Sequence, residues 1–408
     1  MGRGCRPRRC SQMSRRPLPA RFAGHEPLQT ARLNQLDGLR GFAALIVVLF
    51  HFMSALVPFL VPEQQSNAPW ISYSPAAVLW NGTFAVSVFF VLSGFVLTNA
   101  TIRRPDPIWV NVIIRYLRLA CPALLSTCFG WLLLKIFPTE ASALHEVTHS
   151  RWLLWTYQGD IPSFSAAIRS GVFDIFAKGG SYFNNVLWTM RPELFGSILC
   201  FIVCLFKLVR NRIIITSIFL LLIYTLNKYD YGSFIVGIYL REAWAAGKLN
   251  FRFPMIAVIL GLTIGSQSGD AANILGLDWL PSFLAMGTKD SILYPMAAGL
   301  IVYGCINSPT AHRALSGKIG LFLGSISFPL YLVHVPVIYT VFSFIFLIRP
   351  DNIIYQVLVF IFAFAAIISL AYMAEVFVER PFLKQLGKLR YFLNDLSSRL
   401  RGRIRGHK

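Results

Sequence analysis

The sequence predicts an all-α fold, a polytopic integral membrane helical bundle of about ten transmembrane helices. Of its 408 residues, 55% are hydrophobic and only 14% are charged, whereas about a quarter of the residues in a soluble domain are charged. The mean hydropathy is +0.58, and apolar runs long enough to form membrane spans recur along most of the chain. The expected spans are residues 42–61, 78–99, 117–137, 186–206, 213–227, 232–247, 254–269, 288–306, 319–347 and 353–378.

The distribution of positive charge between these spans indicates the topology. A net charge of +20 is compatible with nucleic-acid binding, but the Lys and Arg residues gather in alternate loops, as the positive-inside rule requires. With an even number of spans, the Arg-rich segments 1–35 and 380–408 lie on the same side, which is the cytosol. We therefore expect a multi-pass protein of the plasma membrane or an endomembrane, with both termini cytosolic and no nucleic-acid partner.

Three parts are expected along the chain. Residues 1–35 form a disordered basic cytosolic tail; they resemble a transit peptide in composition, but their prolines oppose its amphipathic helix. Residues 36–380 form the membrane domain, whose first span serves as its own insertion signal in place of a cleavable signal peptide. In residues 381–408, Leu recurs every three or four positions among Lys and Arg. That pattern indicates a basic amphipathic cytosolic helix on anionic headgroups, or else a solvated charged tail.

The cysteines give no indication of a disulfide or a metal site. The chain has seven, of which two lie in the N-terminal tail and five in apolar spans, with none in the long loop 138–185. An extracytoplasmic disulfide framework would place cysteines in that loop. We therefore expect no structural disulfide and no bound metal.

The ionisable pair that most strongly indicates function consists of one residue just before the first predicted span and one residue within it. Arg40 and His51 lie eleven positions apart in the segment LDGLRGFAALIVVLFHF. At about 1.5 Å per helical residue, an Arg40 at the interface places His51 roughly 16 Å deeper, near the middle of a hydrocarbon core about 30 Å thick. An ionisable group at that depth is costly and usually marks a functional site. A base at mid-membrane is therefore expected.

A pair of arginines lies at the start of the third predicted span. Arg115 and Arg118 lie three residues apart in IIRYLRLACPAL, so they share a helix face. Guanidinium groups bind phosphate bidentately and stay charged when partly dehydrated. The pair predicts a phosphate-binding clamp on the cytosolic side of the membrane. Arg40 is expected at the same cytosolic entrance of the bundle. The alternative is that the pair only anchors and orients the span.

Three further ionisable residues lie in or beside later spans. Glu193 in LWTMRPELFGS and His334 in SISFPLYLVHVP are expected in the outer half of the membrane, where they approach His51. A lone buried histidine is as often a hydrogen-bonded packing residue as a catalyst. Glu379, near the inner end of the last span, is expected to pair with an arginine. Because ionisable groups gather on several spans, the set favours a functional site.

Six segments occur in an order that is typical of one family. They are LNQLDGLRGFAALIVVLFHF, VSVFFVLSGFVLTNA, IIRYLRLACPAL, LWTMRPELFGSILCF, SISFPLYLVHVPVI and FVERPF, and they cover residues 33 to about 383. With these segments the chain resembles the acyltransferase 3 family of multi-pass membrane O-acyltransferases. The functional positions of that family fall on Arg40, His51, Arg115, Arg118, Glu193, His334 and Glu379.

The resemblance implies an acyltransferase transferring groups other than aminoacyl groups. Its donor would be cytosolic acyl-CoA, foremost acetyl-CoA, as a cosubstrate with no bound cofactor. Its acceptor would be a hydroxyl group of a glycan, lipid or secondary metabolite. The arginines would hold the CoA phosphates, and His51 would act as the base, since burial disfavours a charged imidazole.

The resemblance also implies roles for the remaining residues. Glu193 would orient His51, His334 would bind the acceptor, and Glu379 would form a structural ion pair. Direct transfer to the acceptor and transfer through a transient acyl-histidine both stay open.

Two other classes of function are weighed against the enzyme. A proton-coupled secondary transporter would also place Arg, His and Glu within its spans, but paired discontinuous helices in corresponding halves are not evident in the sequence. A receptor or scaffold does not need an ionisable pair at mid-membrane. The aromatic residues of loop 138–185 fit either a cover over the acceptor entrance or an interfacial aromatic belt.

Overall fold

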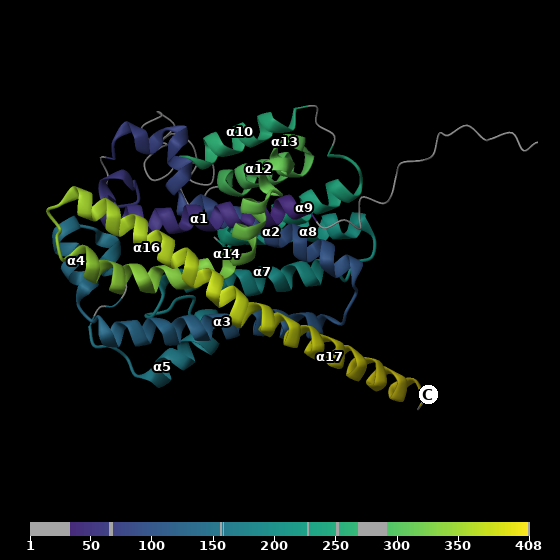
Figure 1. The fold of residues 1–408 in the computed structure, drawn as a ribbon. Helices are drawn as coiled ribbons and strands as arrows, with labels where there is room; N and C mark the ends of the chain where they lie inside the picture. Colours follow the sequence, from purple (N-terminus) through teal and green to yellow (C-terminus); the bar gives the residue numbers. More distant parts are fainter. Residues whose placement is uncertain are drawn as a thin grey trace, which may run out of the picture. The chain divides into compact units, whose positions relative to one another are not determined.

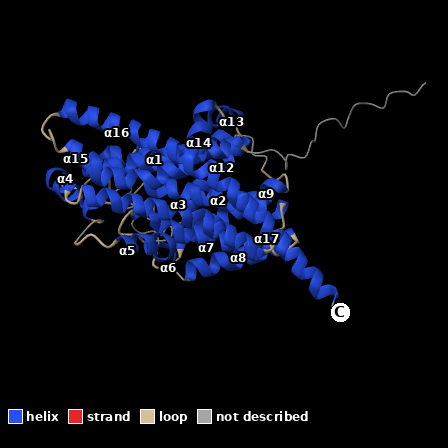
Figure 2. Cartoon of the chain, turned by 60° about the horizontal axis from the view of Figure 1, so that its bottom comes forward, coloured by secondary structure: helices blue, strands red, loops and turns tan. Residues whose placement is uncertain are grey.

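The computed structural model describes the chain in several stretches, with side chains up to residue 400. These stretches are residues 33–64, 68–155, 157, 159–226, 228–249, 253–267 and 292–406. Within them every regular element is helical and no strand occurs, which confirms the all-α prediction (Figure 2). Residues 1–32 of the predicted tail 1–35 lie outside the described residues.

The described chain forms a bundle of long helices joined by short helical turns (Figure 1). The α-helices are α1 Asn34–Leu56, α2 Gly82–Arg103, α3 Ile108–Ile136, α4 Glu140–Thr148, α5 Phe164–Arg169, α6 Ile175–Ala177, α7 Met190–Val203, α8 Val209–Thr225, α9 Gly232–Ala245, α10 Pro254–Gly265, α12 Leu293–Asn307, α13 Pro309–Leu315, α14 Lys318–Val337, α15 Ser343–Phe346, α16 Ile353–Ala374 and α17 Arg380–Gly406. The shorter 3-10 elements include η1 Pro58–Leu60, η4 Arg151–Leu154 and η6 Asn185–Thr189, and the π-helical turns are η5 Ser170–Asp174, η9 Ile338–Phe342 and η10 Glu375–Glu379.

Six of the described helical segments are long and apolar enough to cross a membrane, and α10 and α12 are shorter apolar helices. The length and composition of these helices therefore support a polytopic membrane protein. The number of candidate spans among the described residues is smaller than the expected ten. The predicted span 117–137 belongs to the longer helix α3, which begins at Ile108. The predicted span 186–206 corresponds to the 19-residue segment Asn185–Val203, which begins as η6 and continues as α7.

Helices α1 and α14 run parallel and touch through glycine. A Cβ atom on Gly41 would lie 2.5 Å from the backbone nitrogen of Gly324, and therefore no larger residue fits there without a shift of the helices. Gly41 precedes His51 by ten residues on α1, and Gly324 precedes His334 by ten residues on α14. With equal rise per residue on both helices, the glycine contact brings the two histidines to the same level.

The connection between α6 and α7 enters the bundle as irregular backbone. Asn184 is fully buried and donates from Nδ2 to the carbonyl oxygen of Leu332 at 2.8 Å. In a regular helix this carbonyl would accept from residue 336, but Pro336 has no N–H. Ser126 of α3 donates to the same carbonyl at 2.8 Å. The proline in α14 thus leaves an acceptor that fixes a non-helical segment, which a membrane bundle tolerates only where protein surrounds it.

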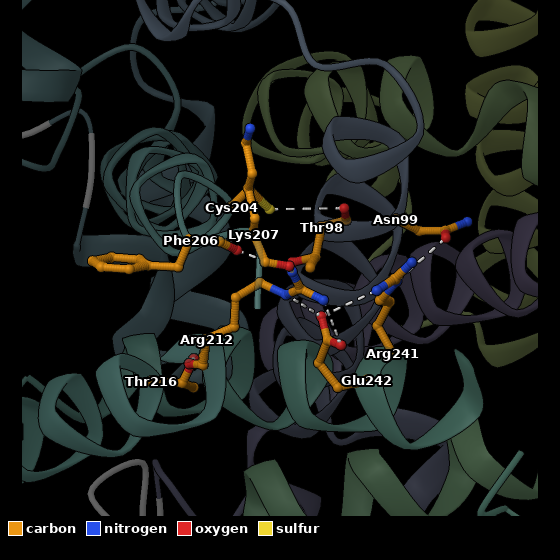
Figure 3. A network of polar contacts seen from close by, with 9 residues as sticks. All are labelled: Thr98, Asn99, Cys204, Phe206, Lys207, Arg212, Thr216, Arg241 and Glu242. Atoms are coloured by element: carbon orange, nitrogen blue, oxygen red, sulfur yellow. Dashed lines mark hydrogen bonds and ion pairs between the residues drawn. The ribbon is translucent and has the colours of Figure 1, made fainter. Parts of the chain in front are cut away.

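A buried ion cluster joins α2, α8 and α9 (Figure 3). Arg212 donates to both carboxylate oxygens of Glu242, at 2.8 and 3.0 Å. Arg241 donates to the same carboxylate at 3.1 Å and to Asn99 of α2 at 3.4 Å. All three charged side chains are at most 7% exposed. The mutual pairing satisfies the requirement that buried charges have partners, and it explains how the predicted span 232–247 contains two charged residues.

The C-terminal helix α17 packs on the first half of α3 through part of its apolar stripe. Figure 1 shows it continuing from α16, and Leu386 lies in a cluster with Val110 and Ile114 of α3. Arg390 donates to Asp106 at 2.8 Å beside this cluster. The predicted amphipathic segment 381–408 lies in α17 as far as residue 406, and α3 covers the first part of its apolar face. Leu400, farther along, is exposed.

We expect Gly41→Ala to disturb the contact between α1 and α14. The added methyl group would overlap backbone of α14, and overpacking of this kind costs about 1–3 kcal/mol. The midpoint of thermal unfolding in detergent should fall. The matched control is Gly387→Ala on α17, where a Cβ would meet nothing within 4 Å. Equal midpoints for both variants would show that the helices do not touch at Gly41.

Candidate active site

The candidate site has two polar clusters at different levels of α1. Arg40 lies in the second turn of the helix and His51 in its last third. Their separation of eleven residues corresponds to roughly 16 Å along the helix. Side chains from α3, α7 and α14 complete the clusters, so the two ends of the site depend on helices that are distant in sequence.

The histidine cluster is formed by direct contact between His51 and His334. The Nδ1 atom of His51 lies 2.9 Å from Nε2 of His334. The Nδ1 atom of His334 in turn lies 3.0 Å from the carbonyl oxygen of Leu330, one turn earlier on α14. The two imidazoles and this carbonyl therefore form a continuous hydrogen-bonded chain.

The carbonyl at the end of this chain determines where the protons lie in the neutral pair. A carbonyl oxygen only accepts, so Nδ1 of His334 is the protonated nitrogen and Nε2 carries the lone pair. His51 must then donate from Nδ1, which leaves the lone pair of its own Nε2 available. A hydrogen bond to one ring nitrogen commonly selects the tautomer of a functional histidine in this way. The geometry thus presents His51 Nε2 as a base or nucleophile.

Burial distinguishes the two histidines. His334 is fully buried, whereas His51 keeps 8% of its surface exposed. Both nitrogens of His334 are hydrogen-bonded, to His51 and to the carbonyl of Leu330, so this geometry supports a role in holding His51 more than the predicted role in binding the acceptor. His51 is the more exposed member of the pair.

An aromatic side chain from the long loop completes the surroundings of His51. The indole ring of Trp152 in η4 stacks on the imidazole, with ring centroids 4.9 Å apart and planes inclined by 29°. Tyr339, in the π-helical turn after α14, donates to the carbonyl oxygen of Trp152 at 2.6 Å. The sequence indicated an aromatic loop but not this contact, because a loop residue has no periodicity that predicts its partner.

The second cluster is built around Glu193 at the start of α7. Its Oε1 atom accepts a hydrogen bond from Ser93 at 2.6 Å and forms an ion pair with Arg115. Arg115 also donates from Nε to Ser197, one turn farther along α7, at 2.7 Å. The expectation that Glu193 orients His51 is therefore corrected. Its carboxylate lies with the arginines, because the irregular segment before α7 enters the bundle at Leu332, close to His334, and α7 therefore begins beyond the level of the histidines.

The other two predicted arginines lie close to this pair. Arg40 is 3.7 Å from Asp37 on α1, and Arg118 is 3.9 Å from Glu379. Arg40 and Arg118 interact electrostatically with each other, with Arg115 and with Glu193. The side chains of Arg40 and Arg118 are 30% and 39% exposed. An anion can therefore reach them.

The arginine cluster has the composition of an anion site. Three guanidinium groups meet the carboxylates of Asp37, Glu193 and Glu379, and two of the three ion pairs are longer than 3.5 Å. Guanidinium groups in loose, partly exposed ion pairs have the chemistry to bind phosphate bidentately.

No group of three or more His, Cys, Asp or Glu side chains among the described residues is arranged to hold a metal ion. The described cysteines, Cys121, Cys128, Cys200, Cys204 and Cys305, are all free thiols.

No curated protein and no solved structure matches the chain. The family model of the acyltransferase 3 proteins, described as an acyltransferase domain, matches residues 33–372. This range contains both histidines and the three arginines and confirms the resemblance inferred from the sequence. The chain belongs to the acyltransferase 3 family.

Proposed function

We propose that the protein is a membrane-embedded O-acyltransferase that moves an acyl group from cytosolic acyl-CoA to a hydroxyl group of an acceptor. Acetyl is the acyl group we expect, and the acceptor belongs to the glycans, lipids or secondary metabolites. The observation that carries this proposal is the hydrogen-bonded chain from Leu330 through His334 to His51. These hydrogen bonds occur in a member of the acyltransferase 3 family. His51 lies roughly 16 Å along α1 from the arginine cluster.

The two clusters suit the two parts of an acyl-CoA molecule. The anionic phosphates would lie among Arg40, Arg115 and Arg118, and the pantetheine arm would extend along α1. The thioester would then reach His51. Holding the phosphates at a fixed distance from the base converts the reaction into an intramolecular one, which is a large source of rate enhancement.

In direct transfer, the hydroxyl oxygen of the acceptor attacks the thioester carbonyl while His51 Nε2 takes the hydroxyl proton. The new C–O bond forms, the C–S bond breaks, and the proton passes from His51 to the departing CoA sulfur. His334 stabilises the transient imidazolium because it accepts the hydrogen bond from His51 Nδ1.

In the covalent alternative, Nε2 itself attacks the thioester and releases the CoA thiolate. The acceptor oxygen then attacks the acyl-histidine, with breakage of the C–N bond and transfer of its proton to the thiolate or to water. Both routes use the same lone pair, so the geometry supports either.

The position of the clusters suggests how the membrane takes part. Acyl-CoA is a cytosolic molecule, so the arginine end of the bundle would face the cytosol, as would both termini. The acceptor would approach His51 from the opposite end. The enzyme would then deliver an acyl group to the far side of the membrane while CoA itself stays in the cytosol.

We expect His51→Ala to abolish transfer without loss of donor binding. Purified protein in nanodiscs, supplied with acetyl-CoA and an extract of candidate acceptors, should release free thiol at least about 100-fold more slowly than wild type, because general base catalysis is lost. Equilibrium binding of acetyl-CoA should be retained, since the arginines are intact.

The matched control for this experiment is His312→Ala, which removes an exposed histidine of α13. It should release thiol at the wild-type rate. Equal thiol release by wild type and His51→Ala would remove His51 from the mechanism. Absence of acceptor-dependent release by the wild type with every donor and acceptor would contradict acyl transfer.

We expect Glu193→Gln to act on donor binding and not on the chemical step. The variant keeps an oxygen acceptor for Ser93 but removes a negative charge beside three arginines. The dissociation constant for CoA should fall about tenfold at low salt, and the gain should shrink as the salt concentration rises. Isothermal calorimetry in nanodiscs would measure both effects.

Asp395→Asn on α17 provides the matched charge control, since its side chain is 41% exposed and pairs with Arg399. CoA binding should be unchanged in this variant. If Glu193→Gln instead lowered turnover at saturating acetyl-CoA with unchanged CoA binding, Glu193 would act at the histidines after all.

A further inference from the structure

The segment of residues 139–155, which we name the cover segment, crosses the bundle at the C-terminal end of α1. It contains α4 and η4. Leu144 is fully buried and Trp152 is 1% exposed, whereas Trp155, three residues farther on, is 63% exposed. The cover segment thus places one of its two tryptophans inside the bundle, against His51, and the other at the surface.

A carbonyl left free by proline anchors the cover segment to α1. The carbonyl oxygen of Ser54 would accept from residue 58 if the helix continued, but Pro58 has no N–H. Gln64 donates to this carbonyl at 3.0 Å, and Ser150 of the cover segment donates to it as well. The side-chain oxygen of Gln64 accepts from the backbone nitrogen of Trp152 at 3.0 Å.

The other side of Trp152 is held by the helix that carries His334. Tyr339 donates to the Trp152 carbonyl at 2.6 Å, and the two rings lie 4.5 Å apart. Tyr339 lies in η9, where the helix widens to a π-helical turn, a feature that is frequent at functional sites. The Trp152 backbone is therefore bonded at both its nitrogen and its oxygen, and the indole ring has a fixed position.

We propose that Trp152 is a positioning residue that holds the His51 imidazole by stacking and keeps water from the ring face that it covers. The proposal rests on the proposed acyl transfer. It adds a reason why the acyl group would pass to the acceptor and not to water. Three side chains border the imidazole: His334 through its hydrogen bond, Phe50 edge-on with a centroid distance of 5.0 Å, and Trp152 face-on.

The exclusion of water matters because water competes with the acceptor. Water activated at His51 Nε2 would attack the thioester carbonyl, form the C–O bond of a free carboxylic acid and release CoA as its thiol. Such hydrolysis wastes the donor without acylating the acceptor. A closed apolar wall beside the base suppresses side reactions of this kind.

The first test measures access to His51 without any need for acyl transfer. Diethyl pyrocarbonate acylates unprotonated imidazole, and mass spectrometry locates the modified histidine. In Trp152→Ala, the modification rate of His51 should rise about tenfold over wild type, as expected when a fixed wall is opened. Trp152→Phe, which keeps an aromatic ring, and Trp155→Ala, the exposed control, should both remain near the wild-type rate.

The second test measures thiol release from acetyl-CoA with and without the acceptor extract. In Trp152→Ala, release without acceptor should increase and release that depends on acceptor should decrease. An unchanged rate of His51 modification in folded Trp152→Ala would overturn the proposal. So would an equal loss of both kinds of thiol release with no rise in hydrolysis, which is the pattern of a merely structural residue.

The two tests separate this proposal from the proposed function. If the wild type releases no thiol with any acceptor, acyl transfer fails, yet the diethyl pyrocarbonate rates still report whether Trp152 covers His51. If the wild type transfers acyl groups and Trp152→Phe behaves like Trp152→Ala, the indole ring itself is required. The proposal that an aromatic stack suffices would then be contradicted.

Discussion

The close contact between α1 and α14 is the constraint on which the rest of the site depends. Gly41 and Gly324 allow the two backbones to touch, and the equal spacing of ten residues from each glycine to its histidine sets His51 and His334 side by side. A hydrogen bond of 2.9 Å between the imidazoles leaves little tolerance in this register. One extra residue in either helix would turn its histidine by about 100° and break the pair.

Two prolines connect this helix pair with the loops around it. Pro58 frees the carbonyl of Ser54 just after His51, and Pro336 frees the carbonyl of Leu332 just before His334. Each carbonyl accepts hydrogen bonds from polar side chains of distant segments, the cover segment in one case and the buried Asn184 in the other. An unsatisfied carbonyl inside the bundle would cost several kcal/mol. The prolines that leave these two carbonyls without a helical partner therefore fix the non-helical backbone beside the histidines.

The sequence predicts the parts of this arrangement that depend on local pattern. Apolar runs predict the helices, and the cost of ionisable groups within them singles out Arg40, His51 and His334. The partners of these residues depend on register between helices that are far apart in sequence, and a single sequence does not contain that information. For this reason Glu193 was expected at the histidines but lies with Arg115, and His334 was expected to bind the acceptor but binds His51. Trp152 was one of several loop aromatics with no sign that it would contact the base.

The central claim is that His334 fixes the tautomer of His51 and so leaves Nε2 as the reactive atom. Nitrogen-15 NMR of histidine-labelled protein in nanodiscs tests it most directly, with the His51 signals assigned by comparison with His51→Ala. At neutral pH the account predicts that Nδ1 of His51 carries the proton and Nε2 does not. In His334→Phe, this preference should weaken. A proton on Nε2 in the wild type, or a spectrum of His51 that does not change when His334 is replaced, would contradict the account.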